Sequence, residues 1–139
     1  MSSRILAGVR ARVWEQARHR CGYCQSRQEY VLGFLEVEHI LPRALGGPDD
    51  EDNLWLSCEF CNRYKGTQTR ARDPLTGRRV RLFNPRRQRW TRHFQWEGPF
   101  VVGRTACGRA TVVALKLNNR LAVTVRGNWV EAGWHPPTD

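Results

Sequence analysis

Two Cys-x-x-Cys pairs constrain the fold of this chain more than any other feature. The first pair is Cys21 and Cys24, and the second is Cys58 and Cys61. Four thiolates at these spacings are typical of a tetrahedral zinc site, which joins two distant segments of a chain. In a reducing compartment paired cysteines bind metal rather than form disulfides. The sequence therefore predicts one structural Zn²⁺ held by all four cysteines, and it leaves Cys107 as a buried free thiol.

Length and charge indicate a small protein that binds nucleic acid. The 139 residues fit one domain with one modest core. The formal net charge is +10, and Lys65 and Lys116 are the only lysines. Guanidinium groups bind phosphate in a bidentate manner, so DNA is a better partner for this composition than a membrane surface, although a GC-rich genome also enriches arginine. Without an apolar run that suits a membrane helix or a signal peptide, the expected location is cytoplasmic.

The charges are segregated along the chain. Residues 29–59 contain eight acids and one arginine, whereas residues 63–92 contain eleven basic residues and one acid. The acidic segment can attract a metal cation, and the basic segment that follows it can bind phosphate groups. The residues predicted to contact DNA are Arg43, Arg63, Lys65, Arg70, Arg72, Arg86, Arg87 and Arg89.

Hydrophobic periodicity and turn residues predict an α+β fold. A helix is expected from Ser2 or Ser3 to about residue 20, and Gly22 is expected to provide a permissive backbone between the first two cysteines. Two strands at 31–41 and 54–57 flank a loop rich in glycine and acids. The sequence further predicts a helix at about 62–70 opened by Asn62, a strand at 78–83 and a helix at 121–129, although 122–125 would also suit a strand.

Between the cysteine pairs lie residues that suit phosphodiester chemistry. Cleavage needs a metal to neutralise developing charge and a base to activate water. Glu38 offers the hard oxygen ligand that Mg²⁺ or Mn²⁺ prefers, and His39 is a competent base near neutral pH. Adjacent strand residues point to opposite faces, so Glu38 and His39 can serve one site only where the strand is distorted or ends.

The order of these residues resembles the HNH endonuclease family, from about Cys21 to Lys65. The resemblance implies a ββα-metal hairpin stapled by the four-cysteine zinc site, with flanking helices and a small C-terminal α/β extension. Residues 82–137 are more loosely similar to the tail of small stand-alone bacterial members of the family. We therefore expect a single domain over residues 1–139, with a nuclease core at about 21–72 and an extension at about 73–139.

The resemblance also implies roles for individual residues. The residue that matches Glu38 binds the catalytic metal in this family, and the one that matches His39 is the general base. The residue that matches Asn53 braces the hairpin and orients the base. Asn62 stands where many members have a second metal-binding histidine, which implies a site suited to Mg²⁺ or Mn²⁺. A further histidine ligand four residues later is absent, because position 66 is Gly66.

The function expected from the sequence is metal-dependent hydrolysis of phosphodiester bonds in DNA. Two rivals are a zinc-ribbon module that binds nucleic acid without cutting it, and a phage packaging or assembly accessory that depends on a partner. A binding module needs none of Glu38, His39, Asn53 and Asn62, so their joint presence favours the nuclease.

Overall fold

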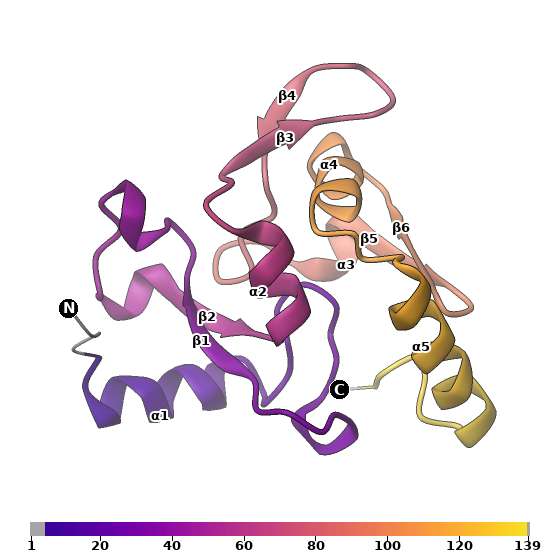
Figure 1. The fold of residues 1–139 in the computed structure, drawn as a ribbon, viewed down its shortest axis with the longest axis horizontal. Helices are drawn as coiled ribbons and strands as arrows, with labels where there is room; N and C mark the ends of the chain where they lie inside the picture. Colours follow the sequence, from indigo (N-terminus) through magenta and orange to yellow (C-terminus); the bar gives the residue numbers. More distant parts are fainter. Residues whose placement is uncertain (1–4, 139) are drawn as a thin grey trace. The chain divides into compact units, whose positions relative to one another are not determined.

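The computed structural model of the protein describes residues 5–138, which divide into two compact units. The first unit comprises residues 5–69 and 84–88, and the second comprises residues 70–83 and 89–138 (Figure 1). In the described range, every helix is too short or too polar to cross a membrane. The fold is mixed α+β, with three separate two-stranded antiparallel sheets.

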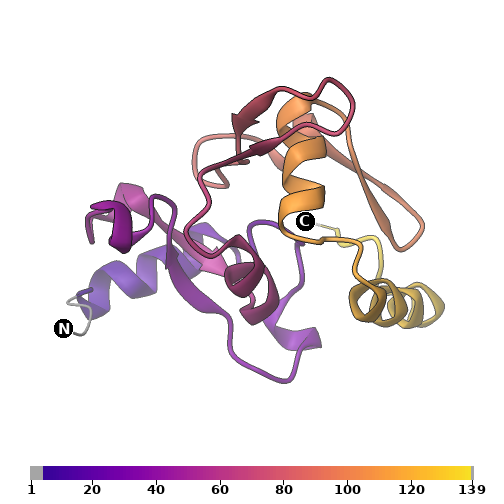
Figure 2. The same ribbon diagram turned by 45° about the horizontal axis from the view of Figure 1, so that its top comes forward.

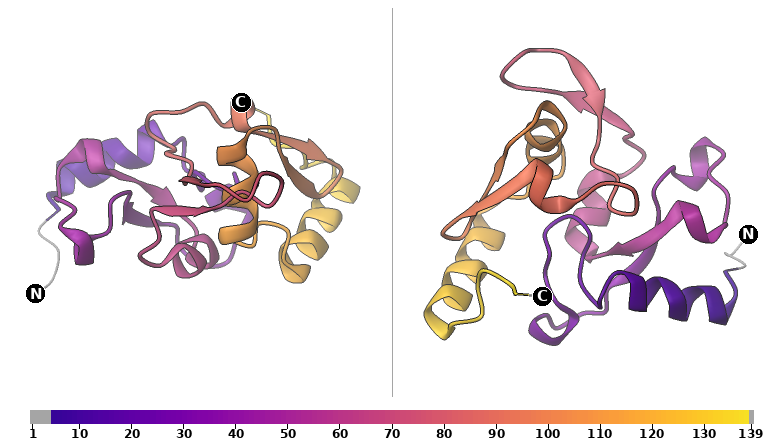
Figure 3. Two further views of the ribbon diagram at one scale, coloured as in Figure 1. Left: turned by 90° about the horizontal axis from the view of Figure 1, so that it is seen from above. Right: turned by 180° about the vertical axis from the view of Figure 1, so that it is seen from behind.

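The first unit is built on one hairpin between two helices. Its helices and strands, in chain order, are α1 (Ala7–Gln16), β1 (Glu36–His39), β2 (Leu54–Ser57) and α2 (Glu59–Lys65). Single 3₁₀ turns lie at Gln28–Tyr30, Arg43–Leu45 and Glu51–Asn53. Helix α1 lies along the β1–β2 hairpin, as both views of Figure 3 show, and its end packs Ala17 against Leu35 and Leu56.

The structure confirms the predicted order of strand, loop, strand and helix, with different boundaries. β1 is shorter than predicted because the Gln28 side chain closes the preceding loop: it accepts a hydrogen bond from the Leu35 N–H at 2.7 Å and donates one to the Gly33 carbonyl at 2.7 Å. These backbone groups therefore have a partner outside the ladder, and the strand begins only at Glu36.

Both helices of the first unit also differ from the prediction. α1 ends at Gln16 because Arg18 and His19 have left-handed backbone angles, with φ of 55° and 56°. The cap predicted at Ser2 or Ser3 lies outside the described residues. α2 begins at Glu59 rather than at Asn62, because the Cys58 Sγ accepts the Cys61 N–H at 3.4 Å and caps the helix.

The second unit contains two hairpins and three helices. In chain order they are β3 (Arg70–Arg72), β4 (Arg79–Arg81), α3 (Trp90–His93), β5 (Phe94–Glu97), β6 (Phe100–Gly103), α4 (Ala106–Ala114) and α5 (Arg120–Ala132). The β3–β4 hairpin packs on α4 (Figure 2). The helix favoured at 121–129 is confirmed by α5. The predicted helix at about 62–70 is wrong at its C-terminal end. The observed helix, α2, ends at Lys65, and Arg70 begins strand β3.

Candidate active site and metal centre

The four cysteines of the two pairs meet at one point of the first unit. Their sulfur atoms all lie within 4.8 Å of one another, and the Sγ atoms of Cys24 and Cys58 are 3.7 Å apart. A tetrahedral zinc ion with bonds of ~2.3 Å sets its sulfur ligands about 3.8 Å apart. Three of the cysteines are buried and Cys58 is partly exposed. The cluster therefore fits the predicted zinc in ligand type, number and spacing.

Close backbone packing holds the first cysteine pair in place. The Gly22 N–H donates to the Leu56 carbonyl of β2 at 2.9 Å, which fixes the first pair to the hairpin. A Cβ atom at position 22 would lie 2.4 Å from the Trp55 ring and 2.6 Å from Pro85. The expectation of a permissive backbone at Gly22 therefore needs a correction: glycine is needed here for space.

The four thiols influence one another strongly because they share one small volume. A hydrogen bond from the Cys21 side chain lowers the pKa of Cys24, and the same neighbour raises the pKa values of Cys58 and Cys61. The hydrogen bonds, together with the charge of Cys21, thus oppose ionisation of Cys58 and Cys61 when no cation is bound. A divalent ion that binds all four offsets this effect, so the cluster has the electrostatic character of a metal site.

Glu38 projects from the middle of the hairpin into the interior, where its residue is 3% exposed. Its carboxylate Oε2 lies 3.3 Å from the Lys65 Nζ, and the buried Tyr23 is its other polar neighbour. Burial raises the pKa of Glu38, while Lys65 and Tyr23 act to lower it. Despite these neighbours, neither carboxylate oxygen accepts a hydrogen bond of good geometry from the described residues. A buried anion with unused lone pairs is a suitable ligand for a hard cation.

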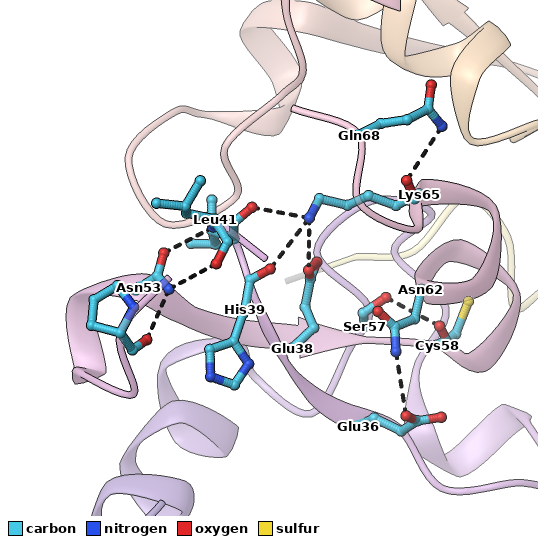
Figure 4. A network of polar contacts seen from close by, with 12 residues as sticks. Glu36, Glu38, His39, Leu41, Asn53, Ser57, Cys58, Asn62, Lys65 and Gln68 are labelled. Atoms are coloured by element: carbon cyan, nitrogen blue, oxygen red, sulfur yellow. Dashed lines mark hydrogen bonds and ion pairs between the residues drawn. The ribbon is translucent and has the colours of Figure 1, made fainter. Parts of the chain in front are cut away.

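Lys65 lies at the end of α2 and points into the protein, with 3% of its surface exposed. Its ammonium donates to the carbonyls of His39 at 3.3 Å and Ile40 at 3.0 Å, in addition to its ion pair with Glu38 (Figure 4). Lys65 therefore joins α2 to the C-terminal end of β1. The sequence placed Lys65 among the DNA contacts, but this inward geometry favours a structural role.

His39 is the last residue of β1, so the strand ends at the proposed base, two residues before the end at residue 41 that the sequence predicted. Its ring and the Glu38 carboxylate point to opposite sides of the strand (Figure 4), so a site shared by these two side chains stays a prediction. The His39 Nε2 lies 2.7 Å from the Asp49 Oδ1, and the Arg43 guanidinium contacts the same oxygen at 3.2 Å. A carboxylate can only accept, so Nε2 of a neutral His39 carries the hydrogen and Nδ1 keeps the lone pair.

Asn53 braces the loop that follows His39. Its Oδ1 accepts the Leu41 N–H at 2.9 Å, and its Nδ2 donates to the carbonyls of Leu41 at 3.1 Å and Pro48 at 2.9 Å. The two ends of the glycine and acid loop are thereby held together next to the base. This geometry agrees with a bracing function, and a catalytic contribution of Asn53 stays a prediction.

Asn62 lies in α2, and its side chain contacts the first residue of β1. The Asn62 Nδ2 donates to the Glu36 Oε2 at 3.4 Å (Figure 4). Among the described residues, no hydrogen bond or ion pair joins the side chains of Glu38, His39 and Asn62 to one another. The structure therefore brings α2 against the hairpin through Glu36 and Lys65, and a metal shared by Glu38 and Asn62 stays a prediction.

The arginines predicted to contact DNA differ in their availability. The Arg86 guanidinium donates to the Leu54 carbonyl at 3.0 Å and to the Gln16 Oε1 at 2.6 Å, and it stacks 4.9 Å from the Trp55 ring. Arg86 thus stabilises the first unit. Arg63 pairs with Glu59 one helical turn away, at 2.8 Å. Arg43 is also paired, with Asp49 at 3.2 Å. The exposed arginines of the set that form no ion pair with another described residue are Arg70, Arg72, Arg87 and Arg89.

Sequence reasoning missed two residues of this site, Asp49 and Tyr23. Asp49 belongs to a run of four consecutive acids, and nothing in the sequence separates it from its neighbours. Tyr23 lies between Cys21 and Cys24, where it is fully buried beside Glu38. Burial and the Glu38 carboxylate raise the pKa of Tyr23, so its hydroxyl stays protonated near neutral pH.

Comparison with known proteins shows what the residues of this site are similar to. Residues 21–68 match the family model described as HNH endonuclease. The chain is also similar to the Septu protein PtuB of Bacillus thuringiensis, with 28% identity over 113 residues. That similarity covers 79% of this chain and 41% of the relative, so the chain spans about two fifths of the relative's length. No solved structure matches the chain significantly.

Proposed function

Since the chain carries an HNH endonuclease domain, a type of phosphodiester hydrolase, we propose that it cuts DNA with His39 as the general base and a divalent metal as the cofactor. The observation that carries this proposal is the environment of His39. Its ring lies at the end of β1, within the residues that match the family, and Asp49 holds its Nε2 at 2.7 Å. A base held in one tautomer and one orientation is what water activation requires.

The ligands that suit the catalytic metal are the Glu38 carboxylate and the Asn62 amide oxygen. Glu38 fits because its buried oxygens lack hydrogen bonds of good geometry, and oxygen donors match Mg²⁺ or Mn²⁺. Such an ion, when bound, neutralises charge on the phosphoryl oxygens and the leaving group. We assign Zn²⁺ to Cys21, Cys24, Cys58 and Cys61, where it stabilises the fold.

The other side chains of the site activate the water, orient the base and bind the DNA backbone. The His39 Nδ1 takes a proton from the attacking water, while Asp49 stabilises the positive charge that forms on the imidazole. Lys65 binds the backbone carbonyls of His39 and Ile40, and Asn53 binds the backbone of Leu41. These contacts fix the chain from His39 onward, which limits the motion of the base. The arginines exposed in the second unit provide contacts for the DNA backbone.

Asp49→Ala should lower kcat and leave DNA affinity nearly unchanged. The His39 ring then loses the carboxylate that orients it and stabilises its protonated form. The loss should be smaller than the ~10²–10⁴-fold expected when the base itself is removed. Asp50→Ala is the matched control, because Asp50 is adjacent, acidic and exposed. Single-turnover cleavage measures the effect, and parent-like kcat in Asp49→Ala would contradict the assigned orientation of the base.

Lys65→Met should destabilise the fold by ~3–5 kcal/mol, because it leaves the buried Glu38 carboxylate without its cationic partner. Chemical denaturation measures the loss. Lys116→Met removes the other lysine, which is exposed, and should change stability little. A double variant with Glu38→Gln should recover part of the loss, because it removes the unpaired charge. Parent-like stability of Lys65→Met would refute the structural role of this ion pair.

The substrate class is tested by incubating the protein with labelled DNA and RNA duplexes of one sequence, with Mg²⁺ present. We expect fragments from the DNA duplex. If only the RNA is cut, the enzyme is a nuclease with a different substrate. If neither is cut at protein excess although the chain binds both, the protein is a nucleic-acid-binding module without catalysis and the nuclease proposal is wrong.

A further inference from the structure

Four arginines stand together on one face of the β3–β4 hairpin. The strand register pairs Arg70 with Arg81 and Arg72 with Arg79. Side chains alternate across a strand, so these four share a face, while Ala71 and Val80 lie on the other. All four arginines are exposed, whereas Ala71 and Val80 are partly buried. We call this set, Arg70, Arg72, Arg79 and Arg81, the arginine ladder.

The ladder places like charges directly opposite each other, which destabilises a hairpin. The ion pairs of arginines in the described part of the chain involve other residues, namely Arg12, Arg27, Arg43, Arg63 and Arg109. Arg72 donates to the Gly77 carbonyl at 2.8 Å, which supplies no negative charge. The face therefore has an uncompensated positive charge that an external anion would neutralise.

The hairpin that carries the ladder is anchored at both ends to α4. Arg109 binds the Asp73 carboxylate through two hydrogen bonds of 2.9 and 3.0 Å, and the Phe83 N–H donates to the Thr111 Oγ1 at 2.9 Å. Asp73 is the only acid in residues 70–83, and it is fully buried. Asp73 therefore neutralises Arg109 and does not neutralise the ladder. The contacts with α4 also fix the backbone of the hairpin in the absence of a ligand.

We propose that the arginine ladder binds the phosphate backbone of duplex DNA. Arg70 and Arg72 are two residues apart on a strand, which separates them by roughly 6.7 Å along one side of the ladder. Duplex DNA presents a phosphate on each strand about every 3.4 Å of its axis, so several guanidinium groups can each meet a phosphate. Backbone contacts of this kind carry affinity and no sequence information. The proposal rests on the proposed function only in the choice of DNA as ligand.

The test measures affinity for a fluorescent duplex at salt concentrations from roughly 50 to 200 mM, without magnesium so that the DNA stays intact. The ladder variant combines Arg79→Gln with Arg81→Gln, and the control combines Arg10→Gln with Arg120→Gln. Both pairs of arginines are exposed, and both variants lose two charges. If the ladder variant neutralises two phosphates fewer than the parent, its slope of log K against log salt should flatten by about 1.8. The control should keep the slope of the parent.

Thermal melting checks that each variant folds, and the ladder variant should melt no lower than the parent because repulsion is reduced. An unchanged slope in the ladder variant overturns the proposal. Equal flattening in both variants also overturns it, because net charge would then explain the binding. Failure of the nuclease assignment is distinguishable from failure of this proposal. If the protein cuts no DNA but the ladder variant shows the predicted change of slope, the nuclease assignment is wrong and the DNA contact of the ladder stands.

Discussion

Cys58→Ala should neither retain zinc nor fold. Cys58 is one of the four clustered cysteines and also caps α2 through the Cys61 N–H, so the substitution removes a proposed zinc ligand and a helix cap together. In small metal-dependent domains, binding of a structural zinc supplies ~10 kcal/mol or more of apparent folding free energy. That is comparable to the whole free energy of unfolding of an ordinary domain, about 5–15 kcal/mol. We expect less than stoichiometric zinc and loss of the cooperative thermal transition.

Cys107→Ala is the matched control for this experiment. Cys107 lies in α4, outside the four-sulfur cluster, and partial burial raises the pKa of its thiol. Its substitution should leave one zinc per chain and a melting transition close to that of the parent. If Cys58→Ala melts like the parent, or if the purified parent contains no zinc, the four cysteines do not form a structural metal site.

His39→Ala should reduce cleavage by ~10²–10⁴-fold, because it removes the proposed general base without opening the core. The His39 ring lies at a strand end and not among the core residues, so folding and zinc content should be retained. His19→Ala is a suitable control, since His19 is exposed and its ring contacts only helix α1, at Glu15 and Trp14, among the described residues. Single-turnover rates at saturating DNA separate the chemical step from binding. A His39→Ala rate within a few-fold of the parent rate would contradict the assigned base.

The metal cluster and the hairpin could be predicted because their chemistry fixes residue type and spacing together. Four cysteines in two short pairs have few other uses in a reducing compartment. The β2 strand at 54–57, and the end of the first strand shortly before Pro42, follow from short apolar runs next to proline and glycine. Local signals of this kind depend on neighbours in sequence, and they require no knowledge of the tertiary fold.

The contacts around His39 and Glu38 could not be predicted because they depend on tertiary packing. The sequence shows that Lys65 follows Cys61 and Asn62, but it gives no signal that this lysine is buried, because lysine is ordinarily exposed. The orientation of Asp49 depends on how Asn53 closes the loop. The arginine ladder could not be predicted because it depends on the register of β3 and β4, and the predicted helix at about 62–70 included Arg70, the first residue of β3.

Digestion of supercoiled plasmid tests most directly whether this chain is a metal-dependent endonuclease, as we propose. The protein is incubated with plasmid in Mg²⁺, in Mn²⁺ and without added metal, with zinc content verified in each sample, and His39→Ala is run in parallel. We predict nicked or linear plasmid with Mg²⁺ or Mn²⁺, none without them, and almost none from His39→Ala. Intact plasmid under every condition, from a folded and zinc-loaded protein in excess over DNA, would contradict the claim.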